Sequence, residues 1–186
     1  VDHGQLFQFG QRSVEIWAIR PGSTFPFIRY SNGRMEIGCA AANSPAKGDN
    51  SVFWLADDLS CRVLRDILPL RISTDAIEDE WSKYSTVADA HGSVLTLGGR
   101  LVYTLTFPTA KATWQYDLGS SLWNELESYD KGRWRGEHYI HCYGKHLISD
   151  FSTSNIGELD IDTYSEWDEP LIWKATSAPI VQQVHW

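Results

Sequence analysis

The chain has 186 residues, 42% of them hydrophobic and 22% charged, which is the composition of an ordinary globular domain. Its net charge of −8, from 24 acidic and 16 basic residues, argues against a DNA-binding surface, because such surfaces replace phosphate counterions with Lys and Arg side chains. Three scattered cysteines are too few for a disulfide framework, and no apolar run approaches the roughly 20 residues of a membrane helix.

The first third of the chain predicts strands separated by polar turns. Residues 5–9 and 14–19 form one expected strand pair, joined by the turn at residues 10–13. Residues 27–31 and 34–37 flank Asn32-Gly33, the strongest signal for a two-residue hairpin, because both turn positions need a positive φ angle. We therefore expect a tight hairpin centred on Asn32-Gly33.

The middle of the chain predicts a strand pair and one helix. Residues 39–50 form a loop or a short inner strand, and residues 51–55 and 61–64 form the strand pair. Residues 73–84, approximately, form the helix, in which Asp75 and Glu78 have the spacing of a capping box. Ile77, Trp81 and Tyr84 share one face of this helix, which we expect to pack against a sheet.

The second half of the chain predicts further hairpins. Residues 94–97 and 100–107 flank Gly98-Gly99, and residues 112–116 return with Trp114 and Tyr116 on one face. A turn at residues 117–119 follows. Residues 138–143 and 146–151 form another pair around Gly144-Lys145, and residues 156–161 add a third strand.

These hairpins repeat along the chain. Strands that begin at Val14, Val52, Val102 and Leu147 are each followed by a return strand, at intervals of roughly 38, 50 and 45 residues, near the spacing of propeller repeats. We predict an all-β, β-propeller-like domain of about four blade-like antiparallel units over residues 1–175. Residues 176–186 form a tail or the start of a following segment. Because the chain starts at Val1 without methionine, we expect a fragment of a longer protein.

One group of residues suggests a metal site, but its spacing does not support one. His138, His141, Cys142 and His146 are close in sequence. Zinc needs ligands that converge in tetrahedral geometry, whereas His138 and Cys142 point to one side of a strand and His141 to the other. We therefore predict neither a metal nor a cofactor.

Acidic residues raise the alternative of a propeller glycoside hydrolase, which needs paired carboxylates at the hub. The acidic residues lie in or beside predicted outer turns instead, and they are Asp117, Glu125, Glu127, Asp160 and Asp162. The turn from Asp117 to Trp123 is also one residue longer than the repeated turn of such enzymes. A hydrolase, or a carbohydrate-binding propeller module, remains the alternative to a non-enzymatic protein.

A basic and aromatic cluster is the candidate partner-binding site. Arg133, Trp134 and Arg135 combine the residue types that anchor protein interfaces. A second functional interpretation is a contact with phosphate or an acidic partner. The interpretation without a binding role is a solvated loop between strands.

Several short segments together resemble the packaged-DNA stabilisation proteins of short-tailed phages, the tail-hub or head-completion family. They are residues 51–55 (SVFWL), 71–78 (RISTDAIE), 105–110 (LTFPTA), 113–117 (TWQYD) and 122–125 (LWNE), in the order and spacing of that family. The resemblance covers about residues 8–172. Two features depart from the family: Asp75 stands where a histidine is expected, and family members are longer at both ends.

This resemblance implies a structural role without catalysis. It implies a β-propeller present in several copies, as a homo-oligomeric ring around the portal axis in the virion tail, assembled in the host bacterial cytoplasm. The implied partners are the portal and adaptor ring above and the tail needle below, so that packaged DNA is retained by closure of the channel. No membrane contact and no sequence-specific nucleic acid binding is implied, in agreement with the acidic charge.

Overall fold

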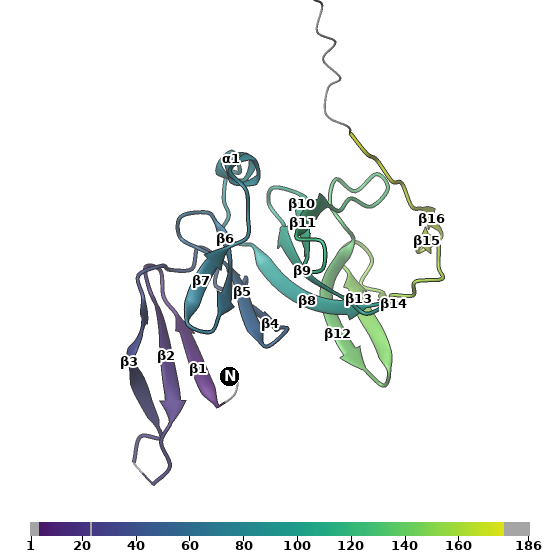
Figure 1. The fold of residues 1–186 in the computed structure, drawn as a ribbon. Coiled ribbons are helices and arrows are strands. Elements are labelled where there is room, and N and C mark those ends of the chain that lie inside the picture. Colours follow the sequence, from purple (N-terminus) through teal and green to yellow (C-terminus); the bar gives the residue numbers. More distant parts are fainter. Residues whose placement is uncertain (1–3, 23, 177–186) are drawn as a thin grey trace, which may run out of the picture.

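The computed structural model describes residues 4–22 and 24–176, and this part of the chain is nearly all β-structure with one helix (Figure 1). The strands form four sheets of three or four strands and a small two-stranded hairpin. The prediction of an all-β protein with about four blade-like units is therefore confirmed. No helix in the described residues is long and apolar enough to cross a membrane.

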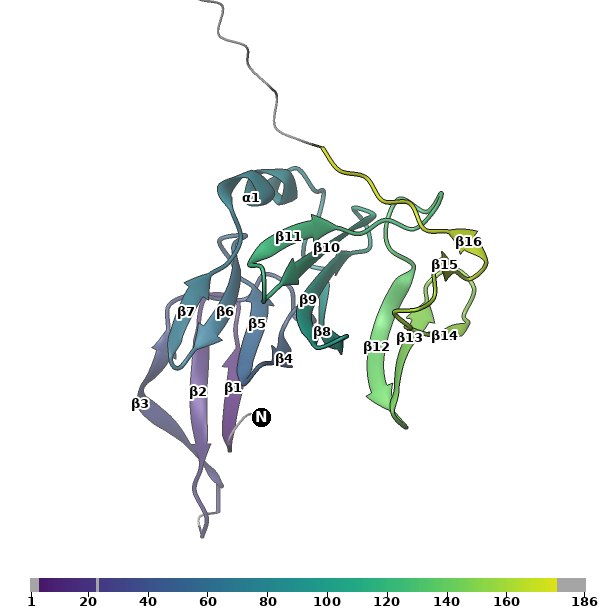
Figure 2. The same ribbon diagram turned by 45° about the vertical axis from the view of Figure 1, so that its right-hand side comes forward.

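Each sheet is a meander of strands that are consecutive in sequence, as Figure 2 also shows. The first sheet is β1–β2–β3, the second β4–β5–β6–β7, the third β8–β9–β10–β11 and the fourth β12–β13–β14. The strands are β1 (Gln5–Phe9), β2 (Val14–Ile19), β3 (Phe27–Met35), β4 (Ala46–Gly48), β5 (Ser51–Leu55), β6 (Cys61–Arg65), β7 (Leu68–Arg71), β8 (His91–Leu97), β9 (Arg100–Phe107), β10 (Ala112–Asp117), β11 (Leu122–Glu125), β12 (Gly136–Cys142), β13 (Lys145–Asp150), β14 (Ile156–Glu158), β15 (Ser165–Glu166) and β16 (Glu169–Pro170).

The four sheets follow one another in an open arc, with the first and fourth sheets at its two ends (Figures 1 and 2). The first strands of the second, third and fourth sheets lie along the inside of the arc, where β4 contacts β8 and β8 contacts β12. Consecutive sheets thus stack face to face around a common centre, as blades do in a propeller.

Two-residue turns join the first two strands of three sheets. Both turn residues have positive φ in each case: 48° and 57° at Asp49-Asn50, 57° and 77° at Gly98-Gly99, and 53° and 72° at Tyr143-Gly144. Such turns match the right-handed twist of the strands that they connect. The Gly98-Gly99 hairpin is confirmed, whereas the last of these turns was expected one residue later, at Gly144-Lys145.

The expected hairpin at Asn32-Gly33 is wrong, because β3 runs through it as a single strand. Glu15 of β2 pairs with Arg34 and Trp17 pairs with Arg29. Residues 30–33 of β3 therefore lie opposite the single residue between them on β2 and form a bulge. A Cβ atom on Gly33 would lie 2.6 Å from the Tyr30 Cβ and 3.0 Å from the Ile16 carbonyl oxygen. Gly33 is thus needed for a close approach of two strands and does not serve a tight turn.

The helix α1 (Asp75–Ser82) is shorter than the expected 73–84, and it has no capping box. Its N-cap is Thr74, whose side chain makes no capping hydrogen bond. Glu78 instead accepts hydrogen bonds from the Ser73 hydroxyl at 2.5 Å and from Arg71 at 2.6 Å. The predicted packing face is confirmed: Trp81 is fully buried, and Ile77 and Tyr84 pack against the core.

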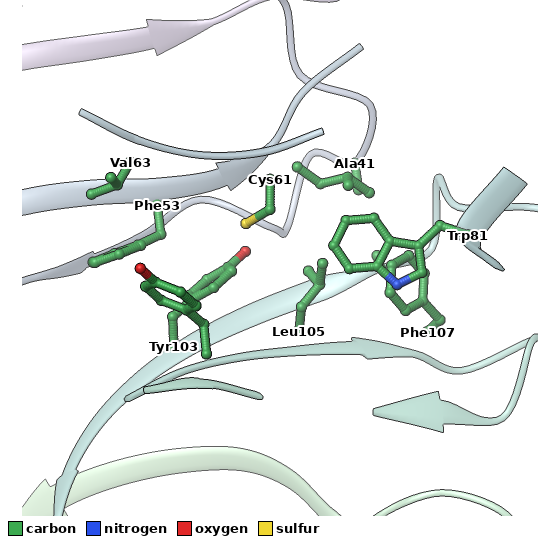
Figure 3. Packing of buried hydrophobic residues seen from close by; sticks show 11 residues of the cluster. Ala41, Phe53, Cys61, Val63, Trp81, Tyr103, Leu105 and Phe107 are labelled. Atoms are coloured by element: carbon green, nitrogen blue, oxygen red, sulfur yellow. The ribbon is translucent and has the colours of Figure 1, made fainter. Parts of the chain in front are cut away.

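The main core lies between the second and third sheets (Figure 3). Phe53 of β5 stacks on Tyr103 of β9 with ring centroids 5.2 Å apart. Trp81 of α1 covers Phe107 at 5.6 Å and closes one end of this core. The helix therefore acts as a lid on the seam between two blades, which explains why its apolar face carries the largest side chain available.

A second core joins the first and second sheets. Trp54 of β5 packs with Val14 and Ile16 of β2, and Phe9 of β1 meets the Trp54 ring edge-on at 5.5 Å. Because side chains alternate along a strand, Phe53 and Trp54 serve opposite faces of the same sheet. This is why all five residues of β5 are buried and why its sequence is continuously apolar after Ser51.

Two segments were not anticipated from the sequence. β7 pairs with β6 although it contains Pro69, which is tolerated because β7 is an outer edge strand. The β15–β16 hairpin follows the fourth sheet. The proposed domain limit at residue 175 stays a prediction, and residues 177–186 of the expected tail lie outside the described residues.

Candidate functional site

The basic and aromatic cluster at residues 133–135 lies where the chain enters the fourth sheet. Arg133 is buried, with 6% of its surface exposed. Its Nη1 atom lies 2.6 Å from Glu137 Oε2, and its guanidinium carbon lies 3.9 Å from the centre of the Phe151 ring. Arg133 is thus bound to its own sheet by an ion pair and a cation–π contact.

Arg135 forms the better defined of the two ion pairs. Its Nε and Nη2 atoms donate to the two oxygens of Asp150 at 3.2 and 2.5 Å, and both side chains are buried. The guanidinium also lies 4.6 Å from the Trp167 ring centre. Burial tends to raise the pKa of Asp150, but hydrogen bonds from Arg135, Thr153 and Ser152 outweigh it and hold that pKa well below its usual range.

Trp134 lies between these two arginines and is only half-buried. A Cβ atom on Gly136 would come within 2.7 Å of its ring, so the indole lies directly over the start of β12. The arginines therefore fix the loop while Trp134 stays partly exposed. Whether the three residues bind a partner stays a prediction, and among them Trp134 is the one placed to touch it.

The seam between the third and fourth sheets is polar, unlike the two apolar seams before it. On the face of the third sheet turned away from Tyr103, the Thr106 and Thr113 hydroxyls lie 3.3 Å apart, and Gln115 donates to Thr104 at 3.4 Å. These threonines are buried. These hydrogen bonds join β9 to β10 within the third sheet, so the face that this sheet turns toward the fourth sheet is polar.

A histidine pair bridges this seam. His91 of β8 makes a hydrogen bond through Nε2 to the Glu137 carbonyl at 3.0 Å, and its ring lies 5.3 Å from the His138 ring of β12. Burial lowers the pKa of His91; the Glu137 carboxylate opposes this, and His138 and Arg133 reinforce it. The seam thus favours neutral His91.

A groove of about 590 Å³ opens at the inner end of the same seam, bounded by β4, β8 and β12. Its fourth-sheet wall carries Tyr139, His141 and His146. The Tyr139 hydroxyl and His146 Nδ1 share a hydrogen bond of 2.6 Å, and the His141 and His146 rings are 4.7 Å apart. The histidines that line the groove are thus already engaged with their neighbours.

The residues considered for metal binding do not converge. His141 and His146 are cross-strand partners on one face, whereas Cys142 pairs with Lys145 on the other. Among the described residues, no group of three or more His, Cys, Asp or Glu side chains is placed to hold a metal ion.

The carboxylates considered for hydrolysis are placed as follows. Asp117 ends β10, accepts a hydrogen bond from the Gly119 amide at 2.8 Å and pairs with Arg100 at 3.3 Å. Asp160 accepts from the Asp162 amide and the Thr163 hydroxyl, both at 3.1 Å. Asp117 and Asp160 thus each stabilise their own turn, a role that requires no substrate.

Three exposed aromatic residues were not singled out from the sequence. Tyr143 at the tip of the β12–β13 hairpin is 97% exposed, Trp173 after β16 is 87% exposed, and Tyr164 is 81% exposed. The sequence could have indicated that Tyr143 is exposed, because this residue precedes Gly144 in a two-residue turn that holds its side chain away from the sheet. Exposed aromatics of this kind are frequent contact residues in interfaces.

Comparison with known proteins identifies a family that this chain matches over most of its length. A family model described as Bacteriophage P22 Gp10, beta-propeller, matches residues 1–164. No curated protein matches the chain. The crystal structure of TolB from Acinetobacter baumannii is similar over 86% of this chain and 43% of that chain, at 14% identity and a TM-score of 0.37. The chain therefore spans less than half of the TolB chain, and this likeness carries no argument about function.

Proposed function

Because this chain belongs to the family of the bacteriophage P22 Gp10 β-propeller, a family of phage structural proteins that stabilise packaged DNA, we propose that it acts as a tail hub or head-completion protein. In this proposal it binds beneath the portal and adaptor ring after packaging, forms a ring of identical copies in the virion tail, and receives the tail needle that closes the channel. It is assembled into the virion in the host bacterial cytoplasm.

The family match over residues 1–164 is the observation that carries this proposal. Two features of the molecule support it. Four small sheets with exposed outer edges provide a rigid body with many contact surfaces. The net charge of −8 is suited to retaining DNA by mechanical closure, since an acidic surface gains nothing by releasing phosphate counterions.

We propose that exposed aromatic residues make the contacts with the portal complex. Trp134 is partly exposed on a loop that Arg133 and Arg135 hold by ion pairs. Tyr143 extends from a hairpin tip with almost its whole side chain in solvent. The firmly held Trp134 loop loses little entropy on binding, and the Tyr143 ring is fully accessible to a partner, so these two residues are the best candidates for anchors.

The test uses purified, DNA-filled heads that lack tails but carry the portal adaptor. We expect the added protein to reduce the amount of DNA that becomes accessible to nuclease over time, in proportion to its occupancy. Replacing Trp134 or Tyr143 with alanine should reduce protection without changing the thermal unfolding temperature. Tyr164→Ala is the matched control, since it removes a similarly exposed ring elsewhere.

Two results would count against the proposal. No binding and no protection by the unmodified protein, with the adaptor present, would exclude a head-completion role. Equal loss of protection in the Tyr164 control would show that the proposed contact residues are not specific. No observation in the described residues favours the alternative hydrolase, so a second function is not proposed.

A further inference from the structure

The hairpin of β12 and β13 brings two histidines together at the groove. His141 and His146 are directly opposite each other in the register of the two strands. The two-residue turn at Tyr143-Gly144 is closed by Cys142 and Lys145, which are therefore a hydrogen-bonded pair. Pairs alternate along an antiparallel ladder, so His141 and His146 form a pair of the other kind, in which the side chains come closest.

The separation of the two imidazole rings matches that of two ligands on one metal ion. Bonds of about 2.0–2.1 Å between zinc and imidazole nitrogen place each ring centre about 3.2 Å from the ion. Two rings on one ion then have centres about 4.5–5.2 Å apart, for angles at the metal of about 90–109°. The ring centres of His141 and His146 are 4.7 Å apart. The hairpin thus already holds the two rings at the separation that a shared ion requires.

Tyr139 fixes the orientation of one of these rings. Its hydroxyl shares a hydrogen bond of 2.6 Å with Nδ1 of His146, and the two rings are stacked with centres 5.9 Å apart. This contact occupies Nδ1 and leaves Nε2 of His146 for a ligand. Histidines that bind metal ions typically use one nitrogen for the ion and the other for a hydrogen bond of this kind. Tyr139 therefore has the place of a positioning residue.

The pair is accessible from the groove of about 590 Å³. His141 is exposed and His146 is half-buried. Two imidazoles leave further coordination positions on an ion, and water fills such positions at open metal sites. The pair needs neither His138 nor Cys142, so it forms a smaller site than the four residues considered from the sequence.

The charges around the pair are compatible with a cation. The chain has a net charge of −8, and an acidic surface raises the local concentration of cations. Lys145, next to His146 in sequence, has its ammonium nitrogen 2.6 Å from a Glu158 carboxylate oxygen, which offsets its charge. Lys47 and Asp49 contribute one charge of each sign to the wall of the groove formed by the second sheet.

We propose that His141 and His146 bind one divalent ion of a first-row transition metal, with Tyr139 as the positioning residue. Imidazole ligands favour zinc, copper and nickel, whereas magnesium and calcium favour oxygen ligands. The ion links β12 to β13 beside their turn. It stabilises this hairpin because it binds the folded chain more tightly than the unfolded chain.

Isothermal titration calorimetry of the whole chain with ZnCl₂ and with NiCl₂ tests the proposal, and MgCl₂ is the control salt. We expect one Zn²⁺ or Ni²⁺ ion bound per chain and no binding of Mg²⁺. His141→Gln and His146→Gln should each weaken Zn²⁺ binding about 100-fold, because one imidazole loses the gain in affinity that two linked ligands provide. His138→Gln is the matched control, since it removes a histidine of the same strand from outside the pair.

A second pair of variants tests the positioning role. Tyr139→Phe keeps the ring but removes the hydroxyl that orients His146, and we expect it to weaken Zn²⁺ binding about tenfold. Tyr143→Phe removes an exposed hydroxyl from the adjacent turn and should leave the affinity unchanged. In NMR spectra, Zn²⁺ should shift the imidazole signals of His141 and His146.

Several outcomes would overturn the proposal. A whole chain that binds neither Zn²⁺ nor Ni²⁺ up to millimolar concentration has no such site. Binding that is unchanged in His141→Gln and His146→Gln would assign the ion to other residues, and so would an equal loss in His138→Gln. Unchanged affinity in Tyr139→Phe would remove the positioning role. These results do not depend on the proposed role at the portal, because no phage component is present.

Discussion

Replacing Asp150 with asparagine removes the charge from the buried ion pair that ties the loop before β12 to the end of β13. The Asp150→Asn change keeps the size of the side chain but leaves the buried Arg135 guanidinium without its ion-pair partner. Breaking a buried ion pair costs about 3–5 kcal/mol. The pair lies near the edge of the fourth sheet, so we expect the lower end, about 3 kcal/mol, or roughly 6–12 °C in unfolding temperature.

Urea unfolding at neutral pH measures this cost, and a double-mutant cycle isolates the pair. Arg135→Met keeps an apolar stem of similar length while it removes the charge, and with it the guanidinium contact with Trp167. We expect the two single changes to be non-additive by about 1.5–3 kcal/mol. Asp160→Asn is the control, because Asp160 accepts similar turn hydrogen bonds but is exposed and faces no arginine.

The pH dependence of stability provides an independent check. The folded-state pKa of Asp150 is lowered, so its contribution is complete above the unfolded value of about 3.9 and is lost as the pH falls toward the folded value. The Asp150→Asn variant should lack this part of the acid slope. A coupling free energy below about 0.5 kcal/mol, or an unchanged acid slope, would refute the view that this pair holds the fourth sheet.

Three further changes test the fold. Gly33→Ala should cost about 1–3 kcal/mol in urea unfolding, because its Cβ would lie 2.6 Å from Tyr30, whereas the exposed neighbour Asn32→Ala should cost almost nothing. Phe53→Ala should cost about 3–5 kcal/mol by calorimetry, and a loss below about 1 kcal/mol would show that the main core repacks. Because burial lowers the pKa of His91, protonation of this histidine destabilises the seam, and amide protection of β8 and β12 should fall as the pH drops below about 6.5. His91→Gln should flatten this pH dependence. An unchanged pH profile in the variant would show that another group causes the dependence.

Local signals predicted most of the strands because each sheet is built from consecutive segments. The Gly98-Gly99 turn could be found from two adjacent residues, since both adopt the positive φ that glycine permits. Asn32-Gly33 gave an equally strong local signal for a tight hairpin, but the structure has a continuous strand there. Its glycine is required both by the Tyr30 Cβ within β3 and by the Ile16 carbonyl on β2, and the second contact lies on another strand that no short stretch of sequence contains.

The candidate site also depends on contacts between residues that are distant in sequence, which local patterns do not predict. Arg133, Trp134 and Arg135 looked like a solvent-facing binding motif because their neighbours in sequence are polar. The residue that decides the environment of Arg135 is Asp150, 15 positions later and on the next strand. Burial of a charge depends on its partner, and the partner is brought close only by the register of β12 against β13.

The meander organisation of the sheets has a consequence for synthesis on the ribosome. Every strand pair within residues 4–22 and 24–176 joins neighbours in sequence, so each of these sheets can close as soon as its own last strand has emerged. The apolar contacts of the first seam are complete once β6 has formed, and those of the second once β11 has joined β10 and α1, because Trp123 of β11 packs against Trp81. The chain can thus fold vectorially, sheet by sheet, and never needs to hold a long unpaired segment while a distant partner is still being translated.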